Sequence, residues 1–191
     1  MLAVFTAIVA QFIFGFLYVP NFKISNFFSF FTIESNTFAA VVLLISTYVG
    51  WKGKPSRKLE YFRGAATLYM VVVGVVYYLL LRGFEADLNT TLPWVNFILH
   101  YFFPVYMLID WLVSPLAHKL RFKYGLVWLI FPLAYLAYSL IRGPIVNWYP
   151  YPFLNPNNEA GTTGIVIVSI GIAALCFVLT WVLTRKKAAN S

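Results

Sequence analysis

Residues that bind metals or cross-link small domains are scarce in this sequence. The 191 residues include one cysteine and two histidines, which exclude a disulfide framework and are too few for a zinc site with three or four such ligands. A haem held between helices usually needs matched histidines, and only His100 lies in an apolar segment. No GxSxG elbow, phosphate-binding loop or dinucleotide fingerprint occurs either. We therefore expect neither a metal nor another cofactor.

Charge is also scarce, at 10% of residues against about 25% in soluble domains. Apolar residues make up 61% of the chain and the mean hydropathy is +0.79, as in proteins with several transmembrane segments. The formal net charge of +8 comes from basic residues in short connectors between apolar runs. Such clusters set topology and contact anionic headgroups, so we expect a membrane protein that does not bind nucleic acid.

Six apolar segments are long enough to cross a bilayer, for which about 20 residues are needed. They are approximately Leu2–Val19, Phe27–Trp51, Gly64–Leu81, Pro93–Val113, Tyr124–Ile141 and Thr163–Thr184. These segments leave no room for a separate soluble domain, and no internal repeat is evident. The sequence therefore predicts an all-α polytopic membrane protein with six transmembrane helices, in which residues 1–191 form a single domain.

The placement of lysine and arginine predicts the orientation. Eleven of the 14 basic residues lie in the connector 52–63, in the connector 114–123 and in the segment after Thr184. The other side has only Lys23, Arg82 and Arg142. Because basic connectors tend to stay in the cytoplasm, both termini are expected to be cytoplasmic.

The segment from Trp94 to Pro115 carries the residue on which the functional interpretation depends. His100 lies inside this apolar run, and an ionisable group in a transmembrane segment is by default a functional-site candidate. At about 1.5 Å per residue, His100 lies roughly 10 Å and Thr32 roughly 8 Å below the outer ends of their segments. Both therefore reach the same level in the outer half of the membrane, with Asn96 on the same helix face as His100.

A hydroxyl next to an imidazole permits one kind of chemistry. A threonine hydroxyl becomes a nucleophile when an adjacent base removes its proton, and histidine suits that role. Thr32 and His100 thus form a candidate catalytic dyad, while Asn96, Ser35, Asn36 or a tyrosine hydroxyl are candidate donors to an oxyanion. Simpler interpretations remain open, in which Thr32 bonds to its own helix backbone and His100 only holds helices together.

Further polar and aromatic residues are expected at the outer rim, where Arg142 or Arg82 is a candidate for holding a substrate carboxylate. The outer connector 142–162 is rich in proline, which forbids a continuous helix. This connector is expected either to close over the site as a lid or to anchor the chain at the headgroups. Asp110, near the cytoplasmic end of its segment, is expected to pair with a basic residue of an inner connector. The candidate substrate-binding residues are Glu34, Tyr78, Arg82, Tyr135, Tyr138, Arg142, Trp148 and Tyr151.

Two motifs resemble the androgen-induced membrane hydrolase family, and more closely its bacterial six-span relatives. They are FFSFFTIESN at Phe27–Asn36 and NFILHYFFPVYMLID at Asn96–Asp110, and the YPYPFL run of the outer connector is typical of the bacterial branch. The resemblance implies a hydrolase of fatty acid esters of hydroxy fatty acids in the bacterial cytoplasmic membrane. It also implies that Thr32 and His100 are the catalytic pair and that the lipid substrate comes from the bilayer. Pro104 lies one position nearer the histidine than in the animal pattern, and the neighbours of the threonine differ.

Two other functions fit the composition. A transporter or channel for a small solute or proton would use Glu34, His100 and Asp110 as a relay, although neither an inverted repeat nor matching broken helices are evident. A non-catalytic lipid-binding protein would use the polar residues only to hold a headgroup.

Overall fold

In the computed structural model, residues 1–53, 56–84 and 92–188 are described, and the regular structure in these ranges is helical. Five helical segments are long and apolar enough to cross a membrane, namely Phe31–Lys52, Arg57–Leu81, Pro93–Val113, Phe122–Val146 and Gly161–Thr184. Helix α1 (Leu2–Tyr18) is also apolar but has only 17 residues. The chain is therefore all-helical, as predicted, and compatible with a polytopic membrane protein.

Several of the long segments consist of more than one element. Two of them contain a π-helical turn, η1 or η2, and two 3-10 turns, η3 and η4, occur later in the chain. The elements after α1 are α2 (Ile24–Phe27), α3 (Phe31–Lys52), α4 (Arg57–Val76), η1 (Tyr77–Leu81), α5 (Pro93–Phe97), η2 (Ile98–Phe102), α6 (Phe103–Val113), α7 (Phe122–Gly125), η3 (Leu126–Leu129), α8 (Ile130–Val146), η4 (Pro152–Leu154) and α9 (Gly161–Thr184).

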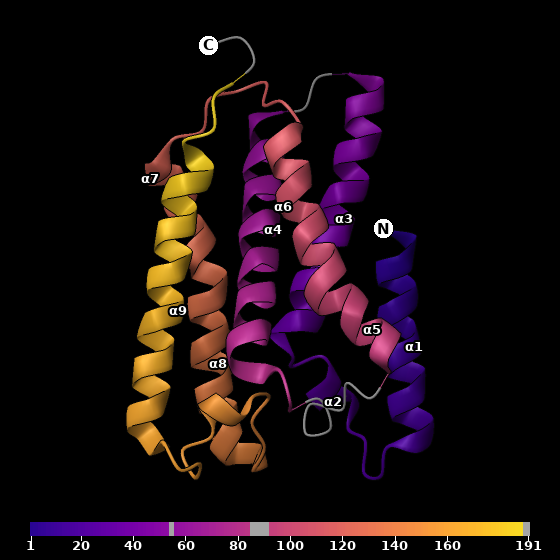
Figure 1. The fold of residues 1–191 in the computed structure, drawn as a ribbon, viewed down its shortest axis with the longest axis vertical. Coiled ribbons are helices and arrows are strands. Elements are labelled where there is room, and N and C mark those ends of the chain that lie inside the picture. The colour runs from indigo at the N-terminus through magenta and orange to yellow at the C-terminus, as the bar shows by residue number, and fades with distance from the viewer. Residues whose placement is uncertain (54–55, 85–91, 189–191) are drawn as a thin grey trace.

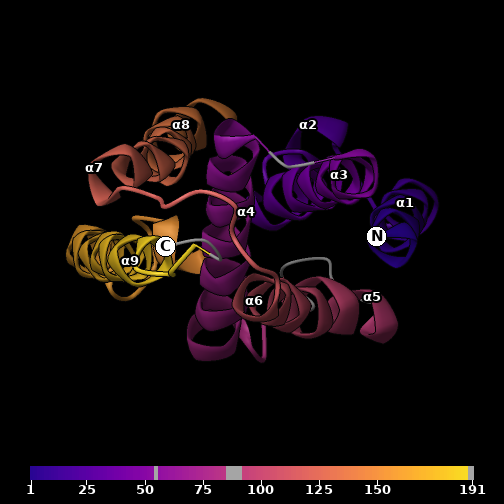
Figure 2. The ribbon, with the colours of Figure 1, turned by 90° about the horizontal axis from the view of Figure 1, so that it is seen from above.

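Helix α4 lies at the centre of the bundle. Seen along the long axis, α8 and α9 lie on one side of α4, and α1, α3, α5 and α6 lie on the other (Figure 2). In the most apolar stretch of the α4–η1 segment, 61% of the residues are buried. In the corresponding stretches of the segments that contain α8 and α9, only 17% are buried. Apolar side chains exposed on these outer helices suit contact with lipid, because lipid tails are as apolar as the side chains themselves.

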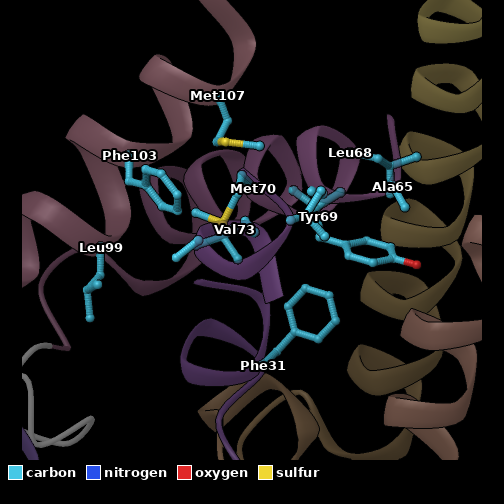
Figure 3. Packing of buried hydrophobic residues seen from close by; sticks show 14 of the residues in the cluster. Phe31, Ala65, Leu68, Tyr69, Met70, Val73, Leu99, Phe103 and Met107 are labelled. Carbon is cyan, nitrogen blue, oxygen red and sulfur yellow. The ribbon is translucent and has the colours of Figure 1, made fainter. Parts of the chain in front are cut away.

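The apolar core forms where α4 meets α3 and α6. Met70 of α4 points toward Phe103 and Met107 of α6, and all three side chains are buried (Figure 3). Tyr69 points to another side of α4, where its ring meets Phe31 of α3 in a T-shaped contact with the centroids 6.2 Å apart. These contacts hold the helices that lead to Thr32 and His100 against the same central helix.

Basic residues gather at one end of the bundle. The C-terminal end of α3, the N-terminal end of α4, the segment between α6 and α7, and the end of α9 lie together at the top of Figure 1. There Arg63 Nη2 lies 2.8 Å from Asp110 Oδ2, so Asp110 pairs with a basic residue as predicted, but this residue lies in α4 and not in an inner connector. Lys186 donates to the carbonyls of Trp111 and Ser114, where a cation suits the C-terminal end of α6. Burial, and then the charge of Arg63, lower the pKa of Lys186.

The predicted second helix is wrong in one respect, because the segment Phe27–Trp51 is interrupted. Helix α2 ends at Phe27 and α3 begins at Phe31. The Ser29 hydroxyl donates to the Ser25 carbonyl at 2.6 Å, and the Ser29 carbonyl accepts from the Tyr135 hydroxyl at 2.8 Å. These two bonds give partners to the Ser25 and Ser29 carbonyls, which lie beside the interruption.

Two other predicted boundaries are also wrong. Helix α4 begins before Gly64, because the side chain of Ser56 caps its N-terminus. Helix α8 runs past its predicted end and contains Pro144, which near the C-terminus removes only one helical hydrogen bond. Asn147, with a φ of 51°, then ends the helix in the left-handed conformation. Arg142 therefore lies on α8 and not in the outer connector.

Candidate functional site

Thr32 is the second residue of α3, just after the interruption that ends at Phe30. The first N–H groups of a helix have no partner within it, and the helix dipole places a partial positive charge there. The Thr32 N–H donates to the hydroxyl of Tyr151, with N and O 3.3 Å apart. Thr32 therefore lies at the end of the helix that stabilises a developing negative charge.

His100 lies in the π-turn η2, and Pro104 explains why the helix departs from α geometry there. Proline has no N–H, so the carbonyl of His100 cannot accept the usual bond from four residues later. The N–H of the preceding residue, Phe103, bonds to the carbonyl of Ile98. In an α-helix it would bond to the carbonyl of Leu99 instead. The carbonyl of Leu99 is thereby free for a contact outside its own helix. Such π-turns are frequent at functional sites.

Asn36 links the two interrupted helices. Its side-chain Nδ2 donates to the Thr32 carbonyl at 2.8 Å and to the Leu99 carbonyl at 3.3 Å. The residue is completely buried, and the two bonds use both hydrogens of its amide. Asn36 therefore positions the segments that carry Thr32 and His100, and has no hydrogen left for the oxyanion role that the sequence suggested.

The hydroxyl of Thr32 and the imidazole of His100 face each other, with Oγ1 and Nε2 3.3 Å apart. On the other side of the ring, Nδ1 lies 3.3 Å from the carbonyl oxygen of Asn96. Because a carbonyl oxygen only accepts, this contact places the proton of the neutral ring on Nδ1 and leaves the Nε2 lone pair facing Thr32. Both side chains are buried. The pair is thus a hydroxyl and a base oriented to deprotonate it.

Tyr77 supports the His100 ring from a second helix. The two rings stack with their centroids 4.1 Å apart and their planes inclined by 22°. Asn96 Nδ2 in turn donates to the Tyr77 hydroxyl at 2.5 Å. Since Tyr77 begins η1, the π-turns of two helices meet at the imidazole. No sequence pattern singled out Tyr77. Pro104 is a sequence signal for η2, whereas no pattern signalled η1.

Tyr151 reaches Thr32 from the connector between α8 and α9. Its hydroxyl lies 3.4 Å from Thr32 Oγ1, and Phe30 and Phe153 pack against its ring with centroids 5.8 and 5.3 Å away. Burial raises the pKa of Tyr151, and its hydrogen bonds to Thr32 oppose this in part. The phenol therefore keeps its proton at neutral pH and can donate it. This part of the outer connector therefore packs against Thr32.

Two cavities meet at Thr32. The polar cavity, of about 350 Å³, lies between α1, the α2 region, α5–η2 and the end of α8. Its polar lining residues, besides Thr32 and Tyr151, are Gln11, Asn21, Lys23, Asn26, Asn96, His100 and Asn147. The apolar cavity, of about 90 Å³, lies between α4, α8 and α9 and is lined largely by hydrocarbon side chains. Thr32 and Tyr151 line both, so they stand at the boundary of the two compartments.

Four other predicted residues surround this site. Tyr135 lines the apolar cavity and donates to the Ser29 carbonyl, and the Tyr138 hydroxyl lies 2.8 Å from Ser29 Oγ. Trp148 lines the polar cavity. Arg142 donates at 2.6 Å to a side-chain oxygen of α2 and lies over the Trp148 ring, 5.3 Å from its centroid. Its guanidinium thus joins α8 to α2 and to the outer connector.

The remaining predicted residues lie away from the pair. Glu34 is two residues after Thr32, so the helix turns it to another face, where it lines a separate groove between α3, α4 and α7–α8. Ser35 is fully buried and lines neither the polar nor the apolar cavity. Tyr78 and Arg82 are exposed near the end of η1, with the guanidinium 5.6 Å from the ring centroid. Lys23 is the cation that lines the polar cavity. The sequence identified it only as one of the few basic residues on the outer side and did not predict it as a site residue.

None of the protein-family models, curated proteins or solved structures compared with this chain matches it. Among the described residues, no group of three or more His, Cys, Asp or Glu could hold a metal ion. The site offers a hydroxyl, a base that faces it, a backbone donor, a phenolic donor and an apolar compartment. This set of groups suits acyl transfer from an ester that carries an apolar chain.

Gly74 of α4 makes room for the π-turn that carries His100. A Cβ atom at Gly74 would lie 3.0 Å from Pro104 Cβ and 3.5 Å from the His100 carbonyl oxygen. We predict that Gly74→Val lowers the free energy of unfolding by about 1–3 kcal/mol, because overpacking forces the backbone to shift. Thermal unfolding in detergent, followed by circular dichroism, measures the effect.

Gly171→Val in α9 is the matched control, since a Cβ there meets nothing within 4 Å. This variant should unfold at the temperature of the unchanged protein or above it, because valine has a higher helix propensity than glycine. Equal unfolding temperatures for the two variants would show that the close approach of α4 and η2 is not required.

Proposed function

We propose that this protein is a polytopic membrane hydrolase that cleaves lipid esters, with Thr32 as the nucleophile and His100 as the general base. The observation that carries the proposal is the 3.3 Å contact between Thr32 Oγ1 and His100 Nε2, at the boundary of a polar and an apolar cavity. The resemblance of two motifs to the androgen-induced membrane hydrolase family supports it. That resemblance favours fatty acid esters of hydroxy fatty acids, or similar esters, as substrates.

The first step transfers the acyl group to the protein. Nε2 of His100 takes the hydroxyl proton of Thr32 while Oγ1 bonds to the ester carbonyl carbon, and the carbonyl electron pair moves to its oxygen. When this intermediate collapses, the bond from carbon to the alkoxy oxygen breaks, and the imidazolium gives its proton to the departing alcohol. The result is an acyl ester of Thr32 and a free alcohol.

The second step uses water in place of the threonine hydroxyl. Nε2 of His100 takes a proton from a water molecule, whose oxygen bonds to the acyl carbon. The bond from carbon to Thr32 Oγ1 then breaks, Thr32 regains a proton from the imidazolium, and the free acid departs. Throughout both steps, the contact between Nδ1 and the Asn96 carbonyl holds the ring in orientation and stabilises its charged form.

Two donors are suitably placed for the negative charge that forms on the carbonyl oxygen. One is the backbone N–H of Thr32 at the N-terminus of α3, and the other is the hydroxyl of Tyr151, which contacts that N–H at 3.3 Å. The positive end of the helix dipole adds to their effect. Donors preorganised in a buried site are the largest single contribution in many acyl-transfer enzymes.

Lys23 favours an ester whose alcohol half carries an anionic group. It is the cation among the residues that line the polar cavity, and its exposed position lets it pair with a carboxylate while partly hydrated. Arg142, which the sequence suggested for this role, is engaged with α2 and Trp148. A hydroxy fatty acid, esterified through its hydroxyl, supplies such a carboxylate.

A proton or solute relay through Glu34, His100 and Asp110 is less well supported. Asp110 is paired with Arg63 at 2.8 Å, and Glu34 lines a groove other than the cavity of His100. The three residues therefore do not share one compartment. A lipid-binding protein without activity would use the same cavities, and is distinguished by the absence of turnover.

We also propose that the chain crosses the bacterial cytoplasmic membrane six times, with α1 as the first span and both termini in the cytoplasm. The clustering of basic segments at one end of the bundle (Figure 1) supports this orientation. Single cysteines introduced in a Cys176→Ser background test it with a membrane-impermeant maleimide. Lys23→Cys should react in intact cells, and Lys119→Cys only after permeabilisation. The reverse pattern would contradict the orientation.

Replacing either member of the pair should abolish hydrolysis without unfolding the protein. We predict that Thr32→Ala and His100→Ala each lower kcat for a long-chain p-nitrophenyl ester by about a thousandfold or more, because nucleophile and base act as one unit. Thr32→Ser should retain measurable turnover and react with a lipid-like fluorophosphonate probe. Mass spectrometry of the labelled protein should place the probe on residue 32.

Thr37→Ala is the control, because the Thr37 hydroxyl only bonds to the Ile33 carbonyl of its own helix at 2.7 Å. It should keep the activity of the unchanged protein. Full turnover by either Thr32→Ala or His100→Ala, measured on protein whose thermal unfolding is unchanged, would refute the dyad.

Tyr151→Phe tests the oxyanion role, since it removes only the hydroxyl and keeps the ring between Phe30 and Phe153. We expect kcat to fall by about 10²–10³-fold with little change in KM, because the donor acts chiefly in the transition state. Tyr138→Phe, which removes a hydroxyl that contacts Ser29, should leave kcat nearly unchanged. Equal effects of the two substitutions on kcat would indicate a structural role for Tyr151.

A further inference from the structure

The apolar cavity takes no part in the proposed proton transfers, yet it ends at the reacting hydroxyl. Protein interiors leave few voids larger than a water molecule, and this one has a volume of about 90 Å³. A buried water needs two to four polar partners, and this lining is hydrocarbon apart from the side chains of Thr32, Tyr135, Tyr151 and Ser169. The cavity is therefore suited to an apolar occupant. Its lining residues include Val72 and Val76 of α4, Leu133 and Leu136 of α8, and Ala173 and Cys176 of α9.

The cavity also reaches the surface that suits contact with lipid. Leu133 lines it and is at the same time 52% exposed on α8. Helices α8 and α9 lie on the same side of α4, opposite α1 and α5 (Figure 2), and of these two helices only the end of α8 lines the polar cavity. The apolar cavity thus connects Thr32 with the outer surface of the bundle.

We propose that the ester is divided at Thr32, with its acyl chain in the apolar cavity between α4, α8 and α9 and its alcohol half in the polar cavity. This inference rests on the proposed hydrolase function and adds the acyl-chain site and the direction in which the substrate binds. The cavity of about 90 Å³ holds a short stretch of chain next to the carbonyl. Longer chains continue past Leu133 into the bilayer.

The division gives each product its own route. After the acyl ester of Thr32 forms, the chain stays in the apolar cavity and the alcohol leaves through the polar cavity. Water then fills the polar cavity beside Nε2 of His100, the nitrogen that must take its proton. Because the apolar cavity excludes water, the attack on the acyl carbon comes from the side of the base.

Photo-crosslinking tests the acyl-chain site without any need for turnover. Thr32→Ala protein in lipid nanodiscs is exposed to a long-chain fatty acid with a diazirine a few carbons from its carboxyl group, and labelled residues are mapped by mass spectrometry. Labels are expected on α8 and α9 at positions that line the cavity. Adding Ala173→Phe, which fills the cavity, should lower this labelling by about tenfold.

Ala174→Phe is the matched control, because Ala174 is the next residue of α9 and is exposed on the outer surface. It places the same aromatic ring toward lipid and should leave the labelling unchanged. Labels confined to α1, α2 or α5, or the same labelling in the two variants, would overturn the proposed acyl-chain site.

Hydrolysis by protein that retains Thr32 separates this inference from the proposed function. Ala173→Phe should lower kcat/KM for long-chain p-nitrophenyl esters about tenfold more than for short-chain esters, and Ala174→Phe should change neither. If the protein hydrolyses esters but Ala173→Phe leaves its chain-length preference unchanged, the acyl-chain site is refuted and the hydrolase function is retained. A protein that is labelled in the cavity but hydrolyses no ester refutes the hydrolase function and retains the apolar chain site.

Discussion

The contact between Thr32 and His100 depends on two helices that are interrupted within the bundle. Non-helical backbone at membrane depth is tolerated only where its polar groups find partners inside the protein or line a cavity. Here the N–H of Thr32 meets the Tyr151 hydroxyl, and the carbonyl of Leu99 receives the amide of Asn36. The same irregular segments that require these partners bring the hydroxyl and the imidazole together.

Polar groups occupy two separate parts of the bundle, the basic end and the surroundings of Thr32. At the basic end, Arg63 and Asp110 pair with each other, and Lys186 binds carbonyls at the end of α6, so these charges stabilise the fold. The central helix α4 divides the rest, with a polar cavity toward α1 and α5 and an apolar cavity toward α8 and α9. Thr32 lies where both cavities end, which suits a substrate with one polar and one apolar half.

Composition and pattern were sufficient for the class of fold. Long apolar runs with few charges predict membrane-length helices because the bilayer leaves no other partner for the backbone, and five such helices are present. The ends of these helices were predicted less well. The interruption at Ser29 and the extension of α8 past Pro144 depend on individual hydrogen bonds and on where a proline falls, to which hydropathy is insensitive.

The sequence by itself predicted that Thr32 and His100 lie at one level, from the rise per residue of two continuous helices. Their side chains do meet, 3.3 Å apart, although the first of these helices is interrupted before Phe31 and the second contains a π-turn. The sequence did not determine which residues surround them, since that depends on helix rotation and on local backbone geometry. Only the tertiary structure brings Tyr151 and Tyr77 to the pair, turns Glu34 into another groove, and engages Asn36 and Arg142 elsewhere. A π-turn rotates every later side chain on its helix, and the carbonyls that it frees accept partners distant in the chain.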